Sequence, residues 1–201
     1  MESYSFKDVI ITISSGVIVL LLLSFKSYVI KTVSGVFEKE KKDPVILSLN
    51  LSKVVQDSIN HLLIEWDANR VYIIQFHNGG HFYTGATMQK YSVTYEDRTP
   101  GTIPLCSYLQ NIQLSTNTYI KNVVDNEYKI DNTEEIVDII SRTFYNEFHI
   151  KSAIGVPIYK NKLVIGAIII NYTDIMHKFS ENDIDLLSMQ CTHLHSLLLV
   201  E

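Results

Sequence analysis

Cysteine is scarce in this chain of 201 residues. The two cysteines, Cys106 and Cys191, lie far apart and belong to no Cys-x-x-Cys or closely spaced Cys/His pattern. Neither a disulfide framework nor a zinc site built on cysteine is therefore expected. In a reducing cytoplasm both cysteines are expected to be free thiols.

Positive charge is also scarce over most of the chain. Residues 43–201 contain 11 Lys and Arg against 18 Asp and Glu, which gives this part a net charge of −7. Contacts with phosphate groups dominate the binding of nucleic acids. An acidic domain of this kind is therefore not expected to bind DNA or RNA.

Known catalytic and metal-binding motifs are missing as well. The chain has no Gly-x-Ser-x-Gly elbow, and no Lys-Ser or Lys-Thr follows Gly79-Gly80 to make a phosphate loop. His77 and His81 are four residues apart but have no carboxylate or cysteine beside them, and zinc needs three or four ligands. We therefore expect no enzymatic activity and no metal site.

Charge is absent from one long segment near the start. Val9–Phe25, VIITISSGVIVLLLLSF, is uncharged, and the apolar Tyr28–Ile30 can lengthen it toward the roughly 20 residues that a bilayer core requires. A cleaved signal peptide is not expected, because residues 1–8 are not basic and no small-residue cleavage site follows. The segment predicts a transmembrane helix over residues 9–30; a buried core helix is the alternative.

The lysines around this segment predict its orientation. One lysine precedes the segment, whereas five follow it closely: Lys26, Lys31, Lys39, Lys41 and Lys42. The positive-inside rule then places the C-terminal part in the cytoplasm. We expect a single-pass protein of the membrane, with a short N-terminal segment (1–8), a charged helical connector (31–43) and one domain (44–201).

The predicted domain mixes helices with antiparallel strands. Asp43-Pro44 predicts a helix start, and an apolar stripe predicts that this helix ends near Asp67. A last helix starts at Ser180, with Asp183 as a capping partner and a buried stripe from Ile184 to Leu198. Strands are expected over Arg70–Phe76, Met88–Glu96, Tyr119–Val124, Ser152–Tyr159 and Leu163–Tyr172, and further helices over Ser107–Leu114 and Thr133–Phe148.

Two of these strands carry further information. In MQKYSVTYE the alternation places Tyr91, Val93 and Tyr95 on one face. Leu163–Tyr172 is almost entirely apolar at its centre, which predicts a central strand covered on both faces.

The last 50 residues carry a resemblance to a known family. The segment SAIGVPIYKNKLVIGAIIINYTDIMHKFSENDIDLLSMQCTHLHSLLL has a Val-Pro strand, a short turn, a Gly-apolar strand, Phe179, a short acidic cap and an apolar closing helix. This order resembles the GAF branch of the PAS/GAF superfamily of sensory domains. The resemblance implies an α+β fold, in which a central antiparallel sheet has the N- and C-terminal helices packed on one face. With its anchor, the chain is similar to small membrane-anchored GAF-like proteins from bacteriophage and bacterial genomes.

The same resemblance implies a small-molecule pocket and dimers formed through the end helices. Cyclic-nucleotide-binding members carry Asn-Lys, Phe and Asp-Glu, whereas this chain has Asn171-Tyr172, Phe179 and Asp183-Ile184, which argues against a cyclic nucleotide. Bilin-binding members have a Cys followed by His, whereas Ser107 follows Cys106 here. No cofactor is therefore expected.

The candidate ligand-binding residues gather where the family builds its pocket. Tyrosine offers an apolar ring with one hydrogen-bonding hydroxyl, which suits a small-molecule site. The alternative is that these tyrosines only cover the sheet, and that Asn78-Gly79-Gly80 only reverses the chain after a strand. The candidates are Phe76, His77, Asn78, Tyr83, Tyr91, Tyr95 and Tyr108.

The favoured function is a non-catalytic sensory or interaction module that is anchored in the lipid bilayer, forms a homo-oligomer and takes a small-molecule ligand. The alternative is a membrane-tethered oligomer or assembly scaffold that binds no ligand.

Overall fold

The computed structural model of the chain describes residues 25–26, 43–116, 118–125 and 128–198. The chain divides into two compact units, 1–47 and 48–201, and the second contains the sheet. The helices are α2 (Pro44–Glu65), α3 (Thr118–Val124), α4 (Ile139–Glu147), α5 (Asp183–Gln190) and α6 (Thr192–Leu197), with short 3-10 turns at Leu114–Thr116 and Thr133–Glu135. The strands are β1 (Arg70–His81), β2 (Thr87–Arg98), β3 (Ile112–Gln113), β4 (Lys129–Ile130), β5 (Ser152–Lys160) and β6 (Leu163–Tyr172).

The six strands form one antiparallel sheet in the order β3-β2-β1-β6-β5-β4. β5 and β6 form the predicted hairpin, in which Asn161 and Lys162 both adopt positive φ, at 48° and 69°. Two such residues match the right-handed twist of the flanking strands. β6 lies between β1 and β5 and is central, as predicted.

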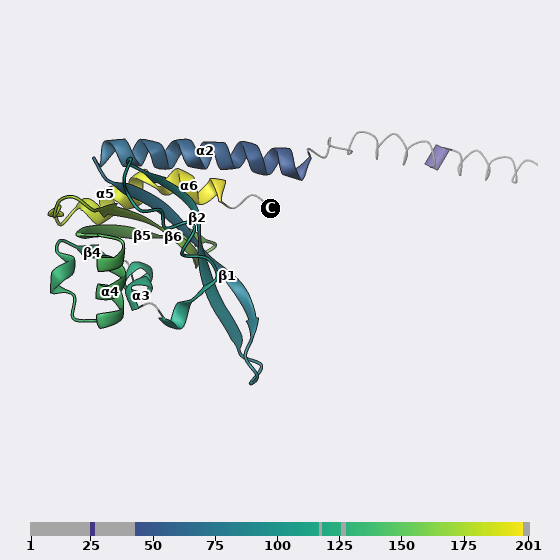
Figure 1. Ribbon diagram of the computed structural model, residues 1–201. Coiled ribbons are helices and arrows are strands. Elements are labelled where there is room, and N and C mark those ends of the chain that lie inside the picture. The colour runs from purple at the N-terminus through teal and green to yellow at the C-terminus, as the bar shows by residue number, and fades with distance from the viewer. Residues whose placement is uncertain (1–24, 27–42, 117, 126–127, 199–201) are drawn as a thin grey trace, which may run out of the picture. The chain divides into compact units, whose positions relative to one another are not determined.

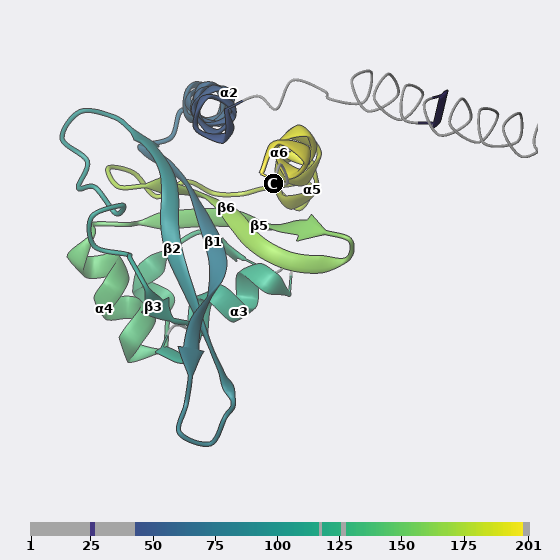
Figure 2. The same ribbon diagram turned by 90° about the vertical axis from the view of Figure 1, so that its right-hand side faces the viewer.

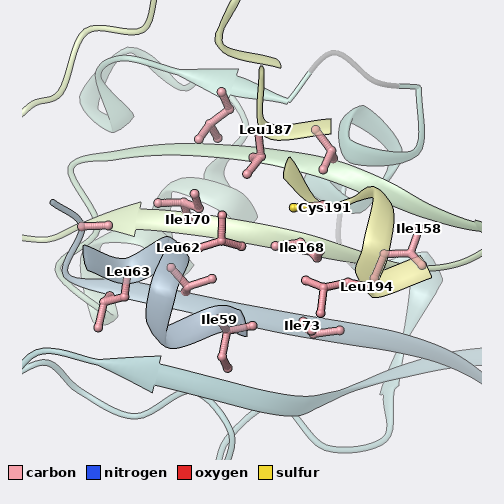
Figure 3. Packing of buried hydrophobic residues seen from close by; sticks show 14 of the residues in the cluster. Ile59, Leu62, Leu63, Ile73, Ile158, Ile168, Ile170, Leu187, Cys191 and Leu194 are labelled. Carbon is pink, nitrogen blue, oxygen red and sulfur yellow. The ribbon is translucent and has the colours of Figure 1, made fainter. Parts of the chain in front are cut away.

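The helices α2, α5 and α6 cover one face of the sheet, and α3 and α4 lie on the other (Figure 1). On the first face, Ile59 and Leu62 of α2 and Leu194 of α6 pack on Ile73, Ile168 and Ile170 (Figure 3). The predicted stripe of the closing segment is confirmed, because Leu187, Cys191 and Leu194 are fully buried. We call this side the helix face.

Tyrosines are prominent in the cluster on the opposite side of the sheet. Tyr72 and Ile74 of β1, Tyr91 and Val93 of β2 and Ile169 of β6 belong to one buried cluster with residues of α3 and α4. We call this side the tyrosine face. The predicted α+β architecture, with both end helices on one side, is therefore confirmed for the described residues.

Four predictions of helices and strands were wrong. The closing helix predicted from Ser180 is instead two helices, α5 from Asp183 and α6 from Thr192. Tyr119–Val124 belongs to helix α3 and is not a strand, because Tyr119, Ile120 and Val123 are spaced as one helical face and are all buried. The predicted helix Thr133–Phe148 is split, since the side chain of Asp138 accepts a hydrogen bond from the Ser141 amide and starts α4 there. Residues 107–114 form turns, a short strand and the start of a 3-10 turn.

The new start of α4 also changes which residues it buries. Ile139 and Ile140 are 69% and 58% exposed, although an unbroken helix over Thr133–Phe148 would place these apolar residues on its inner side, whereas Ser141 and Tyr145 are buried. Helix α2 begins as predicted, where the carboxylate of Asp43 accepts a hydrogen bond from the Val45 amide at 2.8 Å.

The predicted transmembrane helix and most of the charged connector lie outside the described residues. Among the residues that the structure does describe, no helix is both long enough and apolar enough to cross a bilayer.

Candidate functional site

Five tyrosines converge on the tyrosine face from two strands, two helices and one loop position. Tyr72 comes from β1, Tyr91 from β2, Tyr119 from α3, Tyr145 from α4, and Tyr128 directly precedes β4. Each is at most 2% exposed. The ring of Tyr119 stacks on Phe144 at 5.3 Å and lies 5.8 Å from the ring of Tyr128. Strands and helices that are distant in the chain thus bring their phenol groups together in one buried cluster.

Not all of these hydroxyls are paired. The hydroxyls of Tyr128 and Tyr145 form a buried hydrogen bond of 2.5 Å. The hydroxyls of Tyr72 and Tyr119 are fully buried, and neither makes a hydrogen bond of good geometry within the described residues. The Tyr72 hydroxyl faces Asn171 and the Tyr119 hydroxyl faces Tyr91, and each of these contacts is at best a weak side-chain hydrogen bond. A buried hydroxyl without a partner is destabilising, so these two oxygens are places where a ligand or a water molecule would gain a hydrogen bond.

The interior stays uncharged at these positions. Burial raises the pKa values of Tyr72, Tyr119, Tyr128 and Tyr145 above their ordinary value of 10.0, and neighbouring tyrosines contribute. At neutral pH the phenols are therefore neutral donors and acceptors. They suit uncharged polar groups on an otherwise apolar molecule, and they supply no activated nucleophile.

A buried ion pair between Arg70 and Glu96 lies at one end of the tyrosine face. Arg70 Nε lies 3.3 Å from Glu96 Oε1, and the Arg70 guanidinium also donates to the carbonyl of Ile103. The Glu96 carboxylate accepts hydrogen bonds from the backbone amides of Leu105, through Oε1, and of Cys106, through Oε2, both at 2.8 Å. With its amide turned to the better-paired orientation, the Asn171 oxygen accepts from Arg70 Nη1 at 3.3 Å. These contacts hold the loop around residues 103–106 against the sheet.

Gly155 provides space under one of the rings. A Cβ atom at this position would lie 2.9 Å from Cδ1 of Tyr128 and 3.1 Å from the carbonyl oxygen of Ile168. The Gly155 amide also donates to the carbonyl of Tyr128 at 2.9 Å. Only glycine therefore lets Tyr128 lie this close to β5.

The structure brings two of the predicted site residues to this face. Tyr91 is fully buried in the tyrosine cluster, and Phe76 packs against that cluster from the edge. Tyr108 is 58% exposed and meets Phe148 edge-on, with ring centroids 5.5 Å apart. Tyr108 thus lies at the rim of the same cluster.

Tyr95 lies on the opposite face from Tyr91, contrary to the predicted alternation. Ile73 pairs with Tyr95 and Ile74 with Val93, so Thr94 is an extra residue in a β-bulge. The bulge shifts every later side chain to the other face. Tyr95 therefore packs with the helix face, where its hydroxyl lies 3.2 Å from the hydroxyl of Ser52.

His77, Asn78 and Tyr83 lie away from the tyrosine cluster, on a long hairpin. The prediction of a chain reversal at Asn78-Gly79-Gly80 was wrong, because β1 continues to His81 and the chain reverses over Phe82–Ala86. Figure 2 shows this hairpin extending beyond the rest of the sheet. His77 Nε2 lies 3.0 Å from the Ser92 hydroxyl, Asn78 accepts from the Gly80 amide, and Tyr83 is fully exposed at the tip.

Sequence reasoning missed the residues that carry most of the site. Tyr119, Tyr128 and Tyr145 were not singled out, because α3 and the split before α4 were not anticipated. Arg70 was read as the first residue of a strand, although an arginine before VYIIQF is an unusual beginning for a buried strand. The alternation placed Glu96 on the face opposite Tyr91, because the bulge at Thr94 is not visible in the sequence.

Three pockets open on the surface, and one of them reaches Tyr145 and Ile150 of the tyrosine cluster. One of about 440 Å³ lies between α2 and the α5–α6 segment and is lined by Asp57, His61 and His193 among others. One of about 170 Å³ lies beside α4, and one of about 300 Å³ lies at the C-terminal end of α2. Within the part of the chain that the structure describes, no group of three or more His, Cys, Asp or Glu residues could hold a metal ion.

The fold was compared with those of known proteins. No protein-family model matches the chain, and no curated protein matches it. Among solved structures, the GAF domain region of a membrane protein from Geobacter sulfurreducens is similar, with a TM-score of 0.57 at 18% identity, covering 77% of this chain and 96% of that one.

Two further GAF domains of known structure are also similar. The PixJ GAF domain of Thermosynechococcus elongatus has a TM-score of 0.59 at 11% identity, covering 76% of this chain and 86% of that one. A phycoerythrobilin-bound GAF domain from a cyanobacterial phytochrome has a TM-score of 0.56 at 14% identity, covering 77% and 88%. At these identities the likeness shows the fold alone, and the described domain is GAF-like.

Proposed function

We propose that this chain is a membrane-anchored, non-catalytic sensory module whose GAF-like domain binds a small molecule on the tyrosine face. The observation that carries the proposal is the pair of buried hydroxyls, on Tyr72 and Tyr119, that lack a well-formed hydrogen bond. They come from a strand and a helix and point into one cluster, so a single molecule could satisfy both. The ligand class is an uncharged, largely apolar molecule with two hydrogen-bonding groups.

Signal output in this proposal runs through the helix face. β1 and β6 contribute alternate residues to both faces. A shift of Tyr72 on ligand binding would therefore move the neighbouring Ile73, which packs against the helices of the helix face. Helix α2 leads directly from the predicted connector, and it exposes Leu49, Val54 and Ile64. These exposed apolar residues support self-association through α2.

A scaffold without a ligand is the second candidate function. The observation that favours it is the contact between the rings themselves, since Tyr119 and Phe144 stack and Tyr128 bonds to Tyr145. In this case the tyrosines are a packed core, and the domain serves assembly at the membrane. Mass measurement of the chain in detergent then becomes the main test, because a strict monomer would contradict a scaffold.

A thermal-shift screen of nucleotides and metabolites against the detergent-solubilised chain tests the sensory proposal. A ligand at 100 times its Kd stabilises the fold by about 2.7 kcal/mol, which raises the Tm by several degrees. The shift should disappear in the double variant Tyr72→Phe/Tyr119→Phe, which keeps the rings but removes both hydroxyls. A hit that shifts the double variant equally binds elsewhere and contradicts the proposed site.

A further inference from the structure

A pocket of about 300 Å³ lies on the helix side of the domain, at the C-terminal end of α2. It is formed where α2 ends, where β6 ends and where α5 begins. Its lining includes Glu65, Trp66, Tyr172, His177, Asp183 and Gln190. None of these residues belongs to the tyrosine face, so the pocket is separate from the site proposed above.

Three aromatic rings of this lining are held by hydrogen bonds or stacking. The rings of Tyr172 and His177 stack with centroids 4.4 Å apart and planes 9° from parallel. The Tyr172 hydroxyl donates to the carbonyl of Trp66 at 2.6 Å, and the Trp66 indole N–H donates to Gln190 Oε1 at 2.8 Å. The rings therefore lose little freedom when a ligand arrives, which favours binding.

The charged groups of the pocket are negative. Glu65 and Asp183 contribute carboxylates, and no Lys or Arg is among the lining residues. Glu65 accepts a hydrogen bond from Gln190 Nε2 at 2.6 Å, and its other oxygen lies 3.3 Å from His61 Nδ1. Asp183 accepts from the amide and hydroxyl of Ser180. Burial, together with the charges of Asp67 and Asp183, raises the pKa of Tyr172 to about 12, in keeping with a negative potential here.

We infer that this pocket binds a small organic cation of the alkylammonium class. The face of Trp66 attracts such cations, and a methylated ammonium also buries its methyl groups against Trp66 and His177. Tyr172 is 1% exposed and supports the ring of His177 from beneath. The two carboxylates supply charge that a neutral molecule of the same shape cannot use. The site is independent of the tyrosine face and needs no chemical step.

The position of Trp66 gives a direct test, because it is the only tryptophan in the chain. The full chain in a maltoside detergent is titrated with choline, with tetramethylammonium and with 3,3-dimethylbutan-1-ol, the uncharged isostere of choline. Sodium chloride at equal ionic strength serves as the blank. A saturable change in tryptophan fluorescence is expected with both cations, at concentrations at least about tenfold lower than with the alcohol. Equal responses to choline and the alcohol, or no saturable response to choline, would overturn the inference.

Two variants locate the binding. Glu65→Gln should weaken choline binding several-fold while leaving the weak response to the alcohol unchanged. Glu147→Gln changes another exposed glutamate, on helix α4, and serves as the matched control that should leave both responses unchanged. His177→Leu removes one ring and keeps both carboxylates, and it should weaken the binding of both cations. Equal loss in Glu65→Gln and Glu147→Gln would show a general charge effect and overturn the assignment.

Discussion

The guanidinium of Arg70 and the carboxylate of Glu96 form an ion pair inside the domain, with Nε 3.3 Å from Oε1 and side chains 0% and 6% exposed. The pair joins the first residue of β1 to the far end of β2. Glu96 also holds the amides of Leu105 and Cys106, so the same contact fixes the loop beside the tyrosine face. A charge pair thus positions one wall of the candidate site.

Replacing one partner should therefore be severe. Arg70→Met leaves the Glu96 carboxylate buried without its cation, and we expect the free energy of unfolding to fall by about 3–5 kcal/mol. Urea denaturation of the solubilised chain, followed by circular dichroism, measures this loss. Arg142→Met, on the exposed side of α4, is the control and should change stability by no more than about 0.5 kcal/mol.

The double variant Arg70→Met/Glu96→Gln distinguishes the ion pair from simple packing. It removes both charges, so it should recover part of the stability that Arg70→Met loses. A double variant that is less stable than Arg70→Met by the full cost of a second independent change would contradict this account.

Removing different tyrosine hydroxyls should change the free energy of unfolding by different amounts. Tyr128→Phe leaves the Tyr145 hydroxyl buried without its 2.5 Å partner, which should cost about 1–3 kcal/mol. Tyr72→Phe removes a hydroxyl that lacks a well-formed bond, so in the absence of ligand it should be neutral or stabilising. Denaturation of the two variants side by side measures the contrast, and equal destabilisation would mean that Tyr72 is already satisfied.

The two cysteines should differ in their response to pH and to thiol reagents. Burial raises the pKa of Cys191 from 9.0 to about 12, so the folded chain keeps a proton that the unfolded chain releases above pH 9. Stability from this group is present below pH 9 and falls as the pH rises toward 12. Between pH 8 and pH 10 the wild type should lose about 1.4 kcal/mol more than Cys191→Ala.

Thiol labelling gives an independent measurement of the same burial. Cys106 is partly exposed and should react with an aromatic disulfide reagent in the folded chain, slowly, because burial and Glu96 raise its pKa. Cys191 should react only after unfolding. Two fast thiols in the native chain would show that the helix face opens readily.

The parts of the fold that were predicted correctly are those that depend on residue spacing within a single helix, strand or hairpin. The stripe on α2, the β5–β6 hairpin and the closing apolar segment each follow from spacing within one element, and burial of Ile59, Ile168 and Leu187 agrees with it. Asp43 makes the capping contact that its position indicated. Asp183 accepts from Ser180 as expected, but α5 begins only at Asp183, and its N-cap Asn182 makes no side-chain capping bond.

The parts that failed depend on contacts between distant residues. The bulge at Thr94 is visible only in the pairing of β2 with β1, and it decides that Tyr95 leaves the tyrosine face while Glu96 joins it. Helix α3 has β-branched and aromatic residues that favour a strand, but packing against α4 and β5 buries its Tyr119 and Val123 as a helical face. The candidate site could therefore be located by region, but of its five buried tyrosines only Tyr91 was predicted.

A crystal structure of the chain, purified from its host without added ligand, tests the central proposal most directly. The account predicts electron density for a small organic molecule on the tyrosine face, within hydrogen-bonding distance of the hydroxyls of Tyr72 and Tyr119. A face closed by its own tyrosine rings, with water alone at these two oxygens, would contradict the sensory proposal and leave the scaffold.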